Sequence, residues 1–310
     1  MQRCLVIGGS GFIGKQVTHE LLKAGREVSV LDIRMPEAYE HQVTFYNSNE
    51  CSDSALMDIF AGHTEVIDLA YLSNPKTSYD DPLKDIVENL QSTVKMMGLA
   101  LQSKQLKKFL YVSSGGAMYG NTTEDLIPED HATNPVSPYG ITKLAIEKYG
   151  FMFNHAKGFP FVAVRPSNAY GPGQGVNRGQ GFIAQAIYNI LHDEAVVVYG
   201  SQGTIRDYIY ITDLAKGIVA VLNKGRIGEM YNLGTGIGSS NMDVLQLLEG
   251  ICGADQKKVI CSKLPERKFD VNKNVLDCSK VWQHCEWKAE VDLKQGLLNS
   301  WKYYYQLQSS

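Results

Sequence analysis

The sequence predicts an α/β protein, with a Rossmann-type, doubly wound parallel sheet and a smaller, discontinuous C-terminal lobe. A glycine-rich turn separates an apolar run from a helical pattern close to the start of the chain. Short apolar strands then alternate with amphipathic helices, which is typical of a parallel sheet covered on both faces. The second half is more irregular. We therefore expect one lobe at 1–166, rejoined by parts of 207–224, and a second lobe mainly at 167–310.

The composition favours an ordinary globular enzyme. The 310 residues are 44% hydrophobic and carry a net charge of −3, which allows a large core and gives no basic surface for nucleic acid. No apolar run approaches the roughly 18–20 residues of a membrane span, and the start does not resemble a signal peptide. The six cysteines form no C-x-x-C pair and the seven histidines are dispersed. We expect free thiols, a cytoplasmic location, no membrane partner and no metal site.

The first element pair predicts a dinucleotide site. A buried strand is expected at Cys4–Ile7 and a helix from Phe12 to Lys23, with a glycine-rich turn between them. In the dinucleotide fingerprint, one glycine makes the tight turn, one lets the backbone approach the pyrophosphate, and one lets the helix pack closely on the strand. The phosphates then lie at the helix N-terminus. These roles fall to Gly8, Gly11 and Gly14, with Phe12 and Ile13 at the helix start.

The second strand, Glu27–Leu31, ends in an acid that indicates which dinucleotide is bound. Asp32 follows Gly14 by 18 positions, where a carboxylate would bind the adenosine ribose hydroxyls and repel a 2′-phosphate. This favours NAD, with Ile33 beside the adenosine. Arg34 weakens the distinction, because an arginine at this place could accommodate the phosphate of NADP. The alternative for Asp32 is a solvated turn residue.

The remaining elements continue the alternation before it breaks down. Strands are expected at Val43–Tyr46, Glu65–Leu69, Phe109–Val112 and Phe161–Val164, and helices at Ser54–Phe60, Leu83–Lys104 and Ser137–Lys157. A loop follows at Ser167–Gly181, where Gly, Pro, Asn and Gln accumulate. The smaller lobe should contain a helix at Phe182–Leu191 and strands near Val196–Tyr199 and Ile209–Ile211. A ligand cleft is expected between the lobes, at the carboxyl ends of the strands.

Tyr139 and Lys143 are the candidate catalytic pair. A Tyr four residues before a Lys on a helix puts both side chains on one face, about one turn apart. At about 6 Å and an effective dielectric near 20, the ammonium would favour the tyrosinate by roughly 3 kcal/mol, or about two pKa units. That would bring the phenol from about 10 toward 8. The alternative is an ordinary surface helix, and the glycine-rich turn argues against it because it demands the same cofactor chemistry.

Together these motifs resemble the extended short-chain dehydrogenase/reductase family. Within it, the sequence looks most like the NAD-dependent nucleotide-sugar 4-epimerases, of the UDP-galactose epimerase type. The resemblance runs from the first strand to about Trp301. Besides the features above, it rests on Ser113-Ser114, the segment Arg165–Gly173, the hairpin Tyr199–Tyr208, and the motifs Tyr231–Gly236 and Arg267–Asp270.

The resemblance implies a mechanism. Tyr139 would take the proton of the sugar 4-hydroxyl while C4 gives hydride to the nicotinamide, and a 4-keto sugar would turn before hydride returns to its other face. Lys143 would hold the nicotinamide ribose and lower the Tyr139 pKa. Ser114, 25 residues before Tyr139, would steady the 4-oxygen. Counting back from Tyr119-Gly120 instead places Gly115 at this position. Ser113 remains a second candidate for the hydroxyl.

The resemblance also assigns binding residues. On the cofactor side these are Glu50, Leu69, Ala70 and Asn89, in addition to the residues named above. On the substrate side, Arg206 and Arg267 would bind the pyrophosphate, Asp270 the uridine ribose and Asn168 a phosphate. For each residue alone, a structural ion pair or hydrogen bond is the alternative. A homodimer through the helices at Leu83–Lys104 and Ser137–Lys157 is implied by the family.

Three departures bear on the reaction and the substrate. Asp68 and Tyr71 replace the His and the small residue common around Leu69-Ala70, which puts that cofactor wall in doubt. Dehydratases and decarboxylases of the family carry acids where this chain has Gly115 and Gly116, so elimination is disfavoured. Asn274 stands where relatives restricted to plain hexoses carry a bulky residue. We therefore expect UDP-N-acetylhexosamines as substrates, with UDP-glucose and UDP-galactose as the alternative.

Two other functions stay open at this point. One is a nucleotide-sugar dehydratase, reductase or dehydrogenase of the same family, of which the redox enzymes would consume added NAD(P)H stoichiometrically. The other is a non-catalytic NAD-binding sensor, which the intact Tyr139 and Lys143 pair argues against.

Overall fold

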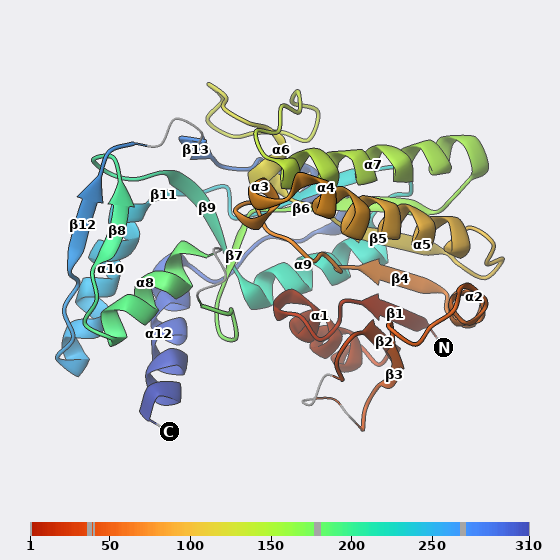
Figure 1. Cartoon of the computed structure of the whole chain (residues 1–310), viewed down its shortest axis with the longest axis horizontal. Helices are drawn as coiled ribbons and strands as arrows, with labels where there is room; N and C mark the ends of the chain where they lie inside the picture. Colours follow the sequence, from red (N-terminus) through yellow and green to blue (C-terminus); the bar gives the residue numbers. More distant parts are fainter. Residues whose placement is uncertain (1, 36–38, 40, 177–180, 267–270, 310) are drawn as a thin grey trace.

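The chain folds into two lobes that lie side by side (Figure 1). The computed structural model describes residues 2–35, 39, 41–176, 181–266 and 271–309. The larger lobe holds the N-terminus, and the smaller lobe ends in the C-terminal helix α12 (Leu293–Ser309). Within the described part of the chain, no helix has both the length and the apolar character needed to cross a bilayer.

Seven parallel strands form the sheet of the larger lobe, in the order β10-β6-β5-β4-β1-β2-β3. The strand order reverses direction between β1 and β4, and ligands of such sheets bind at the carboxyl ends of the strands beside this switch point. The predicted fold class is confirmed. The strands are β1 (Arg3–Ile7), β2 (Glu27–Asp32), β3 (Thr44–Asn47), β4 (Glu65–Asp68), β5 (Lys108–Val112), β6 (Phe161–Pro166) and β10 (Met230–Leu233).

Alternating side chains of the buried strands build a core on each face of this sheet. Cys4 and Val6 of β1 join the core under one set of helices, whereas Leu5 and Ile7 join the core on the opposite face. The first set is α1 (Phe12–Lys23), α9 (Ile211–Lys224) and α11 (Ser279–Cys285). The second set is α2 (Asp53–Gly62), α5 (Ser92–Ala100) and α7 (Pro138–Lys157).

The smaller lobe is assembled around β9 (Ile205–Tyr210), which pairs antiparallel with β11 (Gly238–Ser240) and parallel with β7 (Asn168–Tyr170) and β13 (Lys273–Asn274). A separate parallel pair, β8 (Val196–Tyr199) and β12 (Cys261–Leu264), forms its outer edge (Figure 1). The helices α8 (Phe182–Leu191), α10 (Asn241–Cys252) and α12 pack into one apolar core that includes Ile187, Leu248 and Trp301.

The return of the chain to the larger lobe differs from the predicted stretch 207–224. Residues 207–210 belong to β9 of the smaller lobe, and the return begins with α9. It also includes β10, the seventh strand of the large sheet, and α11. The predicted strand Ile209–Ile211 is also displaced, because Ile211 is already the first residue of α9. Ile209 and Tyr210 are the last residues of β9, and Ile211 is buried at the start of the helix.

The single helix expected at Leu83–Lys104 is broken into three pieces. These are α4 (Pro82–Asp85), a π-helical segment η2 (Ile86–Gln91) and α5, which ends at Ala100. Two polar side chains are buried at this break, Asp85 at the end of α4 and Asn89 in the π segment, and the Asn89 Nδ2 donates to the Asp85 carbonyl oxygen at 3.0 Å. Such π-helical insertions are frequent at functional sites. Three short helical turns complete the fold: α3 (Thr77–Asp80), α6 (Gly115–Met118) and η3 (Gly253–Asp255).

Candidate active site

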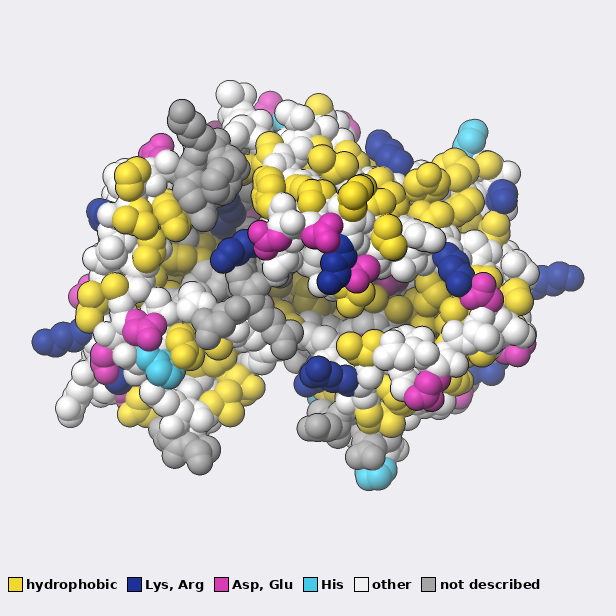
Figure 2. All heavy atoms as spheres, viewed as in Figure 1, with side chains coloured by type: hydrophobic (Ala, Val, Ile, Leu, Met, Phe, Trp, Pro, Cys, Tyr) yellow, Lys and Arg dark blue, Asp and Glu magenta, His cyan; other side chains and the backbone are white. Residues whose placement is uncertain are grey.

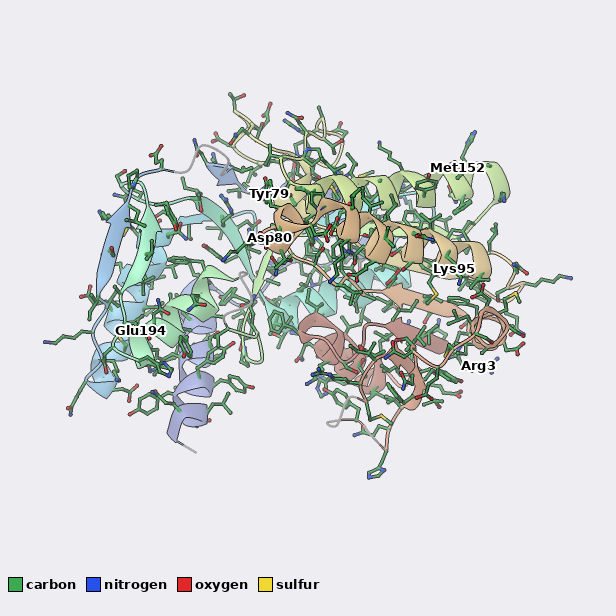
Figure 3. All side chains as sticks on the ribbon, in the orientation of Figure 1. Arg3, Tyr79, Asp80, Lys95, Met152 and Glu194 are labelled. Atoms are coloured by element: carbon green, nitrogen blue, oxygen red, sulfur yellow. The ribbon has the colours of Figure 1, made fainter. Side chains whose placement is uncertain are left out.

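A cleft of about 900 Å³ lies between the two lobes, within the size range of small-molecule sites. Figure 2 shows the surface hollowed between them. The larger lobe contributes the start of α1, the end of β5 and the start of α7, and the smaller lobe contributes β7, β9 and the start of α10. Tyr79 and Asp80 of α3 lie at its rim (Figure 3). The cleft therefore lies at the carboxyl ends of the parallel strands, as predicted.

The glycine-rich turn has the geometry that the fingerprint requires. Gly8 has a φ of +80°, and a Cβ there would lie 2.9 Å from the Ala70 nitrogen. A Cβ on Gly14 would collide with the Gly8 carbonyl oxygen, so this helix packs on the turn only with glycine at that place. No side chain caps the start of α1 at Gly11, which leaves its first N–H groups available to an anion. This cradle fits a dinucleotide pyrophosphate.

Asp32 closes the turn from the neighbouring strand. Its two carboxylate oxygens accept hydrogen bonds from the Ser10 N–H at 2.9 Å and the Ile33 N–H at 2.7 Å. The Ser10 hydroxyl donates to the carbonyl oxygen of Arg34. Glu50 is exposed at the end of the adjacent β3 and accepts from Asn47 at 2.6 Å. The predicted adenosine residues are thus gathered at one end of the strands beside the turn.

The predicted nicotinamide wall is held together by Asn89. Leu69 and Ala70 follow β4, and Ala70 lies against Gly8. The Asn89 side chain is buried, and its Oδ1 accepts the Leu72 N–H at 2.8 Å. In this structure Asn89 fastens the loop after β4 to η2. Its predicted contact with the cofactor stays a prediction.

Helix α7 begins where its sequence signals place it. Ser137 is the N-cap, and its hydroxyl accepts the Gly140 N–H at 3.1 Å, with Pro138 in the first turn. The Ser78 hydroxyl of α3 accepts the Tyr139 N–H at 3.1 Å. Two hydroxyls therefore accept hydrogen bonds from free N–H groups in the first turn of the helix that carries Tyr139 and Lys143. These bonds fix the position of the helix start at the cleft.

The pKa of Tyr139 differs from the expectation. Burial raises the pKa of Tyr139 to about 12, Ser114 opposes this through a hydrogen bond, and the negative charge of Asp85 raises it further. The predicted lowering toward 8 by Lys143 is therefore wrong for this structure. That prediction counted the attraction of the ammonium and omitted the loss of hydration, which is the larger effect in a buried site.

The Lys143 ammonium is held by the end of β5 and makes no hydrogen bond to Tyr139. Its Nζ donates to the Val112 carbonyl oxygen at 2.9 Å and lies 5.9 Å from the centre of the Tyr139 ring. The rings of Tyr71 and Tyr111 are closer, at 4.2 and 4.9 Å. Burial lowers the pKa of Lys143 to about 8, and the charges of Asp68, Glu147 and Asp85 oppose this lowering.

The two candidate serines have different surroundings. Both line the cleft, but Ser114 is the one that acts on the Tyr139 phenol, because its hydroxyl opposes the rise of the Tyr139 pKa. The Ser113 Oγ is buried and has no hydrogen-bond partner among the described residues. This geometry favours Ser114 as the hydroxyl beside the catalytic tyrosine, and it leaves Ser113 available to a bound group.

The substrate side of the cleft brings together Gly116, Asn168 and Arg206. A Cβ on Gly116 would lie 3.7 Å from the Asn168 Oδ1, so this amide faces the wall next to Ser114. Arg206 lies on β9 in the opposite lobe. The predicted Arg267 and Asp270 lie outside the described residues, although the adjacent Val271 lines the cleft.

Asn274 is not among the residues that line the cleft. Its side chain is fully buried behind Gly115, to whose carbonyl oxygen the Nδ2 donates at 3.2 Å. Replacing it by a bulky side chain would therefore overpack the wall rather than narrow an open gate. The direct amide contact to an acetamido group, expected from the sequence, has no support in this geometry.

Sequence reasoning missed part of the lining. The rim residues Lys76, Tyr79 and Asp80 lie on a short helix that has no recognisable motif. Asn241 lies at the start of α10, and its Oδ1 accepts the Thr204 N–H at 2.8 Å. The one available signal was the serine–aspartate capping box that begins α10. It locates the helix start but does not indicate a cleft.

Known proteins resemble this chain over most of its length. A model described as the NAD dependent epimerase/dehydratase family matches residues 4–234. A UDP-glucose 4-epimerase of Mycolicibacterium smegmatis is 28% identical over 311 residues, which cover 97% of this chain and 98% of the relative.

Two solved structures are similar over their full length. The UDP-glucose 4-epimerase of Thermotoga maritima, solved with UDP-glucose, matches with a TM-score of 0.89 and 31% identity, covering 99% of this chain and 100% of that one. The UDP-glucose 4-epimerase of Thermus thermophilus, solved with NAD, matches with a TM-score of 0.88 and 29% identity, covering 98% of this chain and 99% of that one.

Proposed function

Because the chain belongs to the NAD dependent epimerase/dehydratase family, we propose that it is a nucleotide-sugar 4-epimerase acting on UDP-sugars. Its cofactor is NAD. The observation that carries the proposal is that Tyr139 and Ser114, whose hydroxyl opposes the rise of the Tyr139 pKa, line one cleft wall that continues with Gly116 and Ala117. A hydroxyl pair can move one proton at a sugar oxygen, whereas elimination needs further acids at the positions that glycine occupies here.

Tyr139 acts as acid and base at the sugar 4-oxygen. It would accept the 4-hydroxyl proton and later return it; NAD, when bound, would supply the hydride chemistry at C4. Ser114 lowers the Tyr139 pKa by hydrogen bonding to the phenol, which favours the tyrosinate that the first step needs. Gly8, Gly11, Gly14, Asp32 and Lys143 hold the cofactor.

The nucleotide end of the substrate is assigned to the smaller lobe. Arg206 lines the cleft opposite Ser114, and its guanidinium suits the oxygens of a diphosphate. Asn168 is a further contact to the substrate, and Arg267 and Asp270 complete the proposed set. UDP as the nucleotide is supported by the relatives, which are named UDP-glucose 4-epimerases.

The sugar is a hexose or an N-acetylhexosamine. Support for the acetamido group is indirect: the wall at Gly115 and Gly116 is free of side chains, and Asn274 behind it is smaller than an aromatic residue. The test is NMR of the anomeric protons of UDP-glucose and UDP-N-acetylglucosamine, each incubated with the purified protein and no added cofactor.

Appearance of the galacto epimer, and its loss in Tyr139→Phe, is the expected result. Conversion of one sugar alone would identify the accepted C2 substituent. Loss of water from the product would indicate a dehydratase instead. Stoichiometric use of added NADH would indicate net redox chemistry. No change in either sugar, with NAD bound, would overturn the assignment of UDP-glucose and UDP-N-acetylglucosamine as substrates.

A homodimer through α4, η2, α5 and α7 is a further part of the proposal. Large apolar side chains are exposed on these helices, among them Leu83, Val87 and Ile141 at 75, 56 and 57%. Figure 2 shows apolar side chains gathered over this face, and Met152 of α7 points outward on it (Figure 3). Such a patch marks a protein contact. Leu83→Glu with Val87→Glu should give a monomer in light scattering, and an unchanged dimer mass would exclude this face.

A further inference from the structure

The two residues that depart from the family pattern beside the cofactor wall both act on the Lys143 ammonium. Asp68 is the last residue of β4 and is 2% exposed, and Tyr71 follows in the next loop. Asp68 is paired in the sheet with Tyr111 of β5, whose ring lies 4.9 Å from the Lys143 Nζ. The Tyr71 ring lies 4.2 Å from the same nitrogen. Both departures therefore bear on Lys143.

Tyr71 also contacts the other member of the catalytic pair. Its ring meets the Tyr139 ring edge to face, with centroids 4.9 Å apart. Its hydroxyl donates to the Asp85 carboxylate at 3.3 Å, which anchors the ring to the helix at the start of η2. The small residue of the family pattern would leave this space open to water. With Tyr71 in place, the Lys143 side chain is only 3% exposed.

The charges of three carboxylates act on the Lys143 ammonium, and two of these carboxylates have partners of their own. Glu147 forms a buried ion pair with Arg165 at 2.6 Å. Asp85 accepts hydrogen bonds from Tyr71 and from Ser73. Asp68, which accepts the Ala70 N–H at 3.1 Å, opposes the lowering of the Lys143 pKa most strongly. Burial raises the pKa of Asp68 to about 6, and Lys143 opposes that rise.

We propose that Tyr71 and Asp68 are a coupled pair of positioning residues: the Tyr71 ring excludes water from the Lys143 ammonium, and the Asp68 carboxylate keeps that ammonium charged in the dry site. A ring alone would favour the neutral amine, because a buried ammonium loses its hydration. An acid alone would have little effect in water, where charges are screened. This inference rests on the proposed function, in which Lys143 serves the cofactor and Tyr139.

The test is a ¹³C NMR titration of protein labelled at the lysine Cε, without substrate or added cofactor. One lysine signal should titrate with a pKa of about 8, well below the ordinary lysines at about 10.4. Disappearance of this signal in Lys143→Met assigns it to Lys143. Asp68→Asn should lower this value by about 1–3 units, the range for a charge partner at close distance. Tyr71→Ala should raise it, because burial is the main cause of the lowering. Tyr71→Phe keeps the ring and should leave it in place.

The controls separate this pair from general effects. Asp58→Asn removes an exposed carboxylate of α2 and should not move the Lys143 signal. In a Tyr71→Ala background the shift caused by Asp68→Asn should shrink, because water screens the charge. An unshifted signal in Asp68→Asn, or in Tyr71→Ala, would overturn the proposal. A purely structural role would lower the melting temperature without moving the titration.

Turnover is measured separately, so that the two proposals fail independently. In an active enzyme, the alkaline limb of the kcat profile that belongs to Lys143 should move to lower pH in Asp68→Asn and to higher pH in Tyr71→Ala. If Lys143 titrates as expected but the protein converts no UDP-sugar, the proposed epimerase activity is refuted and the proposed role of Tyr71 and Asp68 stands. If the protein is an active epimerase but the Lys143 pKa does not change in Asp68→Asn, only the proposed role of Tyr71 and Asp68 is refuted.

Discussion

Replacing Glu147 by Gln should destabilise the protein strongly, because it breaks the buried ion pair that fixes α7 to the sheet. Arg165 of β6 is bound by Glu147 through two hydrogen bonds, Nε to Oε1 at 3.0 Å and Nη2 to Oε2 at 2.6 Å. Both side chains are at most 2% exposed. Arg165 also donates to the Tyr119 hydroxyl at 2.9 Å. Gln keeps the shape of Glu147 and removes the charge that the guanidinium needs.

The magnitude follows from the burial of both partners. Removing one charge of a buried pair leaves the other uncompensated and costs about 3–5 kcal/mol. For a chain of this size, about 2 °C of melting temperature corresponds to each kcal/mol, so we expect a loss of roughly 6–10 °C. Circular dichroism on heating and unfolding in urea measure it. The epimerase assay should show a loss as well, since Tyr139 and Lys143 are carried by the same helix.

A matched control is Glu88→Gln, the same chemical change in an exposed ion pair with Lys84 four residues earlier. Pairs of that kind contribute about 0.3–0.5 kcal/mol, so its melting temperature should hardly change. If Glu147→Gln costs no more than Glu88→Gln, the pair with Arg165 does not anchor α7 and the reasoning fails.

Three further predictions concern the site. Ser114→Ala should reduce kcat of the proposed epimerase more than Ser113→Ala, because Ser114 lowers the Tyr139 pKa; equal losses would contradict this assignment. Ser137→Ala removes the N-cap of α7 and should cost about 1 kcal/mol in urea unfolding, with Ser137→Thr retaining most of it. The folded-state pKa of Asp68 is raised from 3.8 to about 6, so the protonated form is favoured by folding. Stability should fall as pH rises through that window, and the fall should be absent in Asp68→Asn, measured by urea unfolding between those pH values.

Much of the fold could be predicted because its signals are local. Helix α1 at Phe12–Lys23 and helix α8 at Phe182–Leu191 have the predicted bounds, since a glycine turn precedes one and an apolar period marks the other. The return of β10 and α11 to the larger lobe could not be predicted. Their apolar residues would fit either core, and only the three-dimensional path of the chain decides between them.

The site could be predicted where a motif requires a particular backbone conformation. It could not be predicted where the direction or the pKa of a side chain depends on its burial. Gly8 and Gly14 had to lie against neighbouring backbone, and they do. The resemblance assigns Asn274 by its position along the chain, which locates the strand but not the direction of a side chain. A strand alternates its faces with each residue, so a position correct in sequence can point into the wall. The hydrogen bond of Asn274 to the Gly115 carbonyl oxygen is this outcome.

The electrostatics of Tyr139 and Lys143 show what spacing alone leaves undetermined. A separation of four residues establishes that both side chains share one face of α7, and the structure agrees. The sign of the pKa shift depends on water, and water is excluded by residues far away in the sequence, such as Tyr71 and Ser114. Attraction between the pair would lower the phenol pKa, whereas burial raises it to about 12. Any lowering needed for turnover must therefore come from groups that approach Tyr139 in the assembled site, and Ser114 is the group that already opposes the rise in this structure.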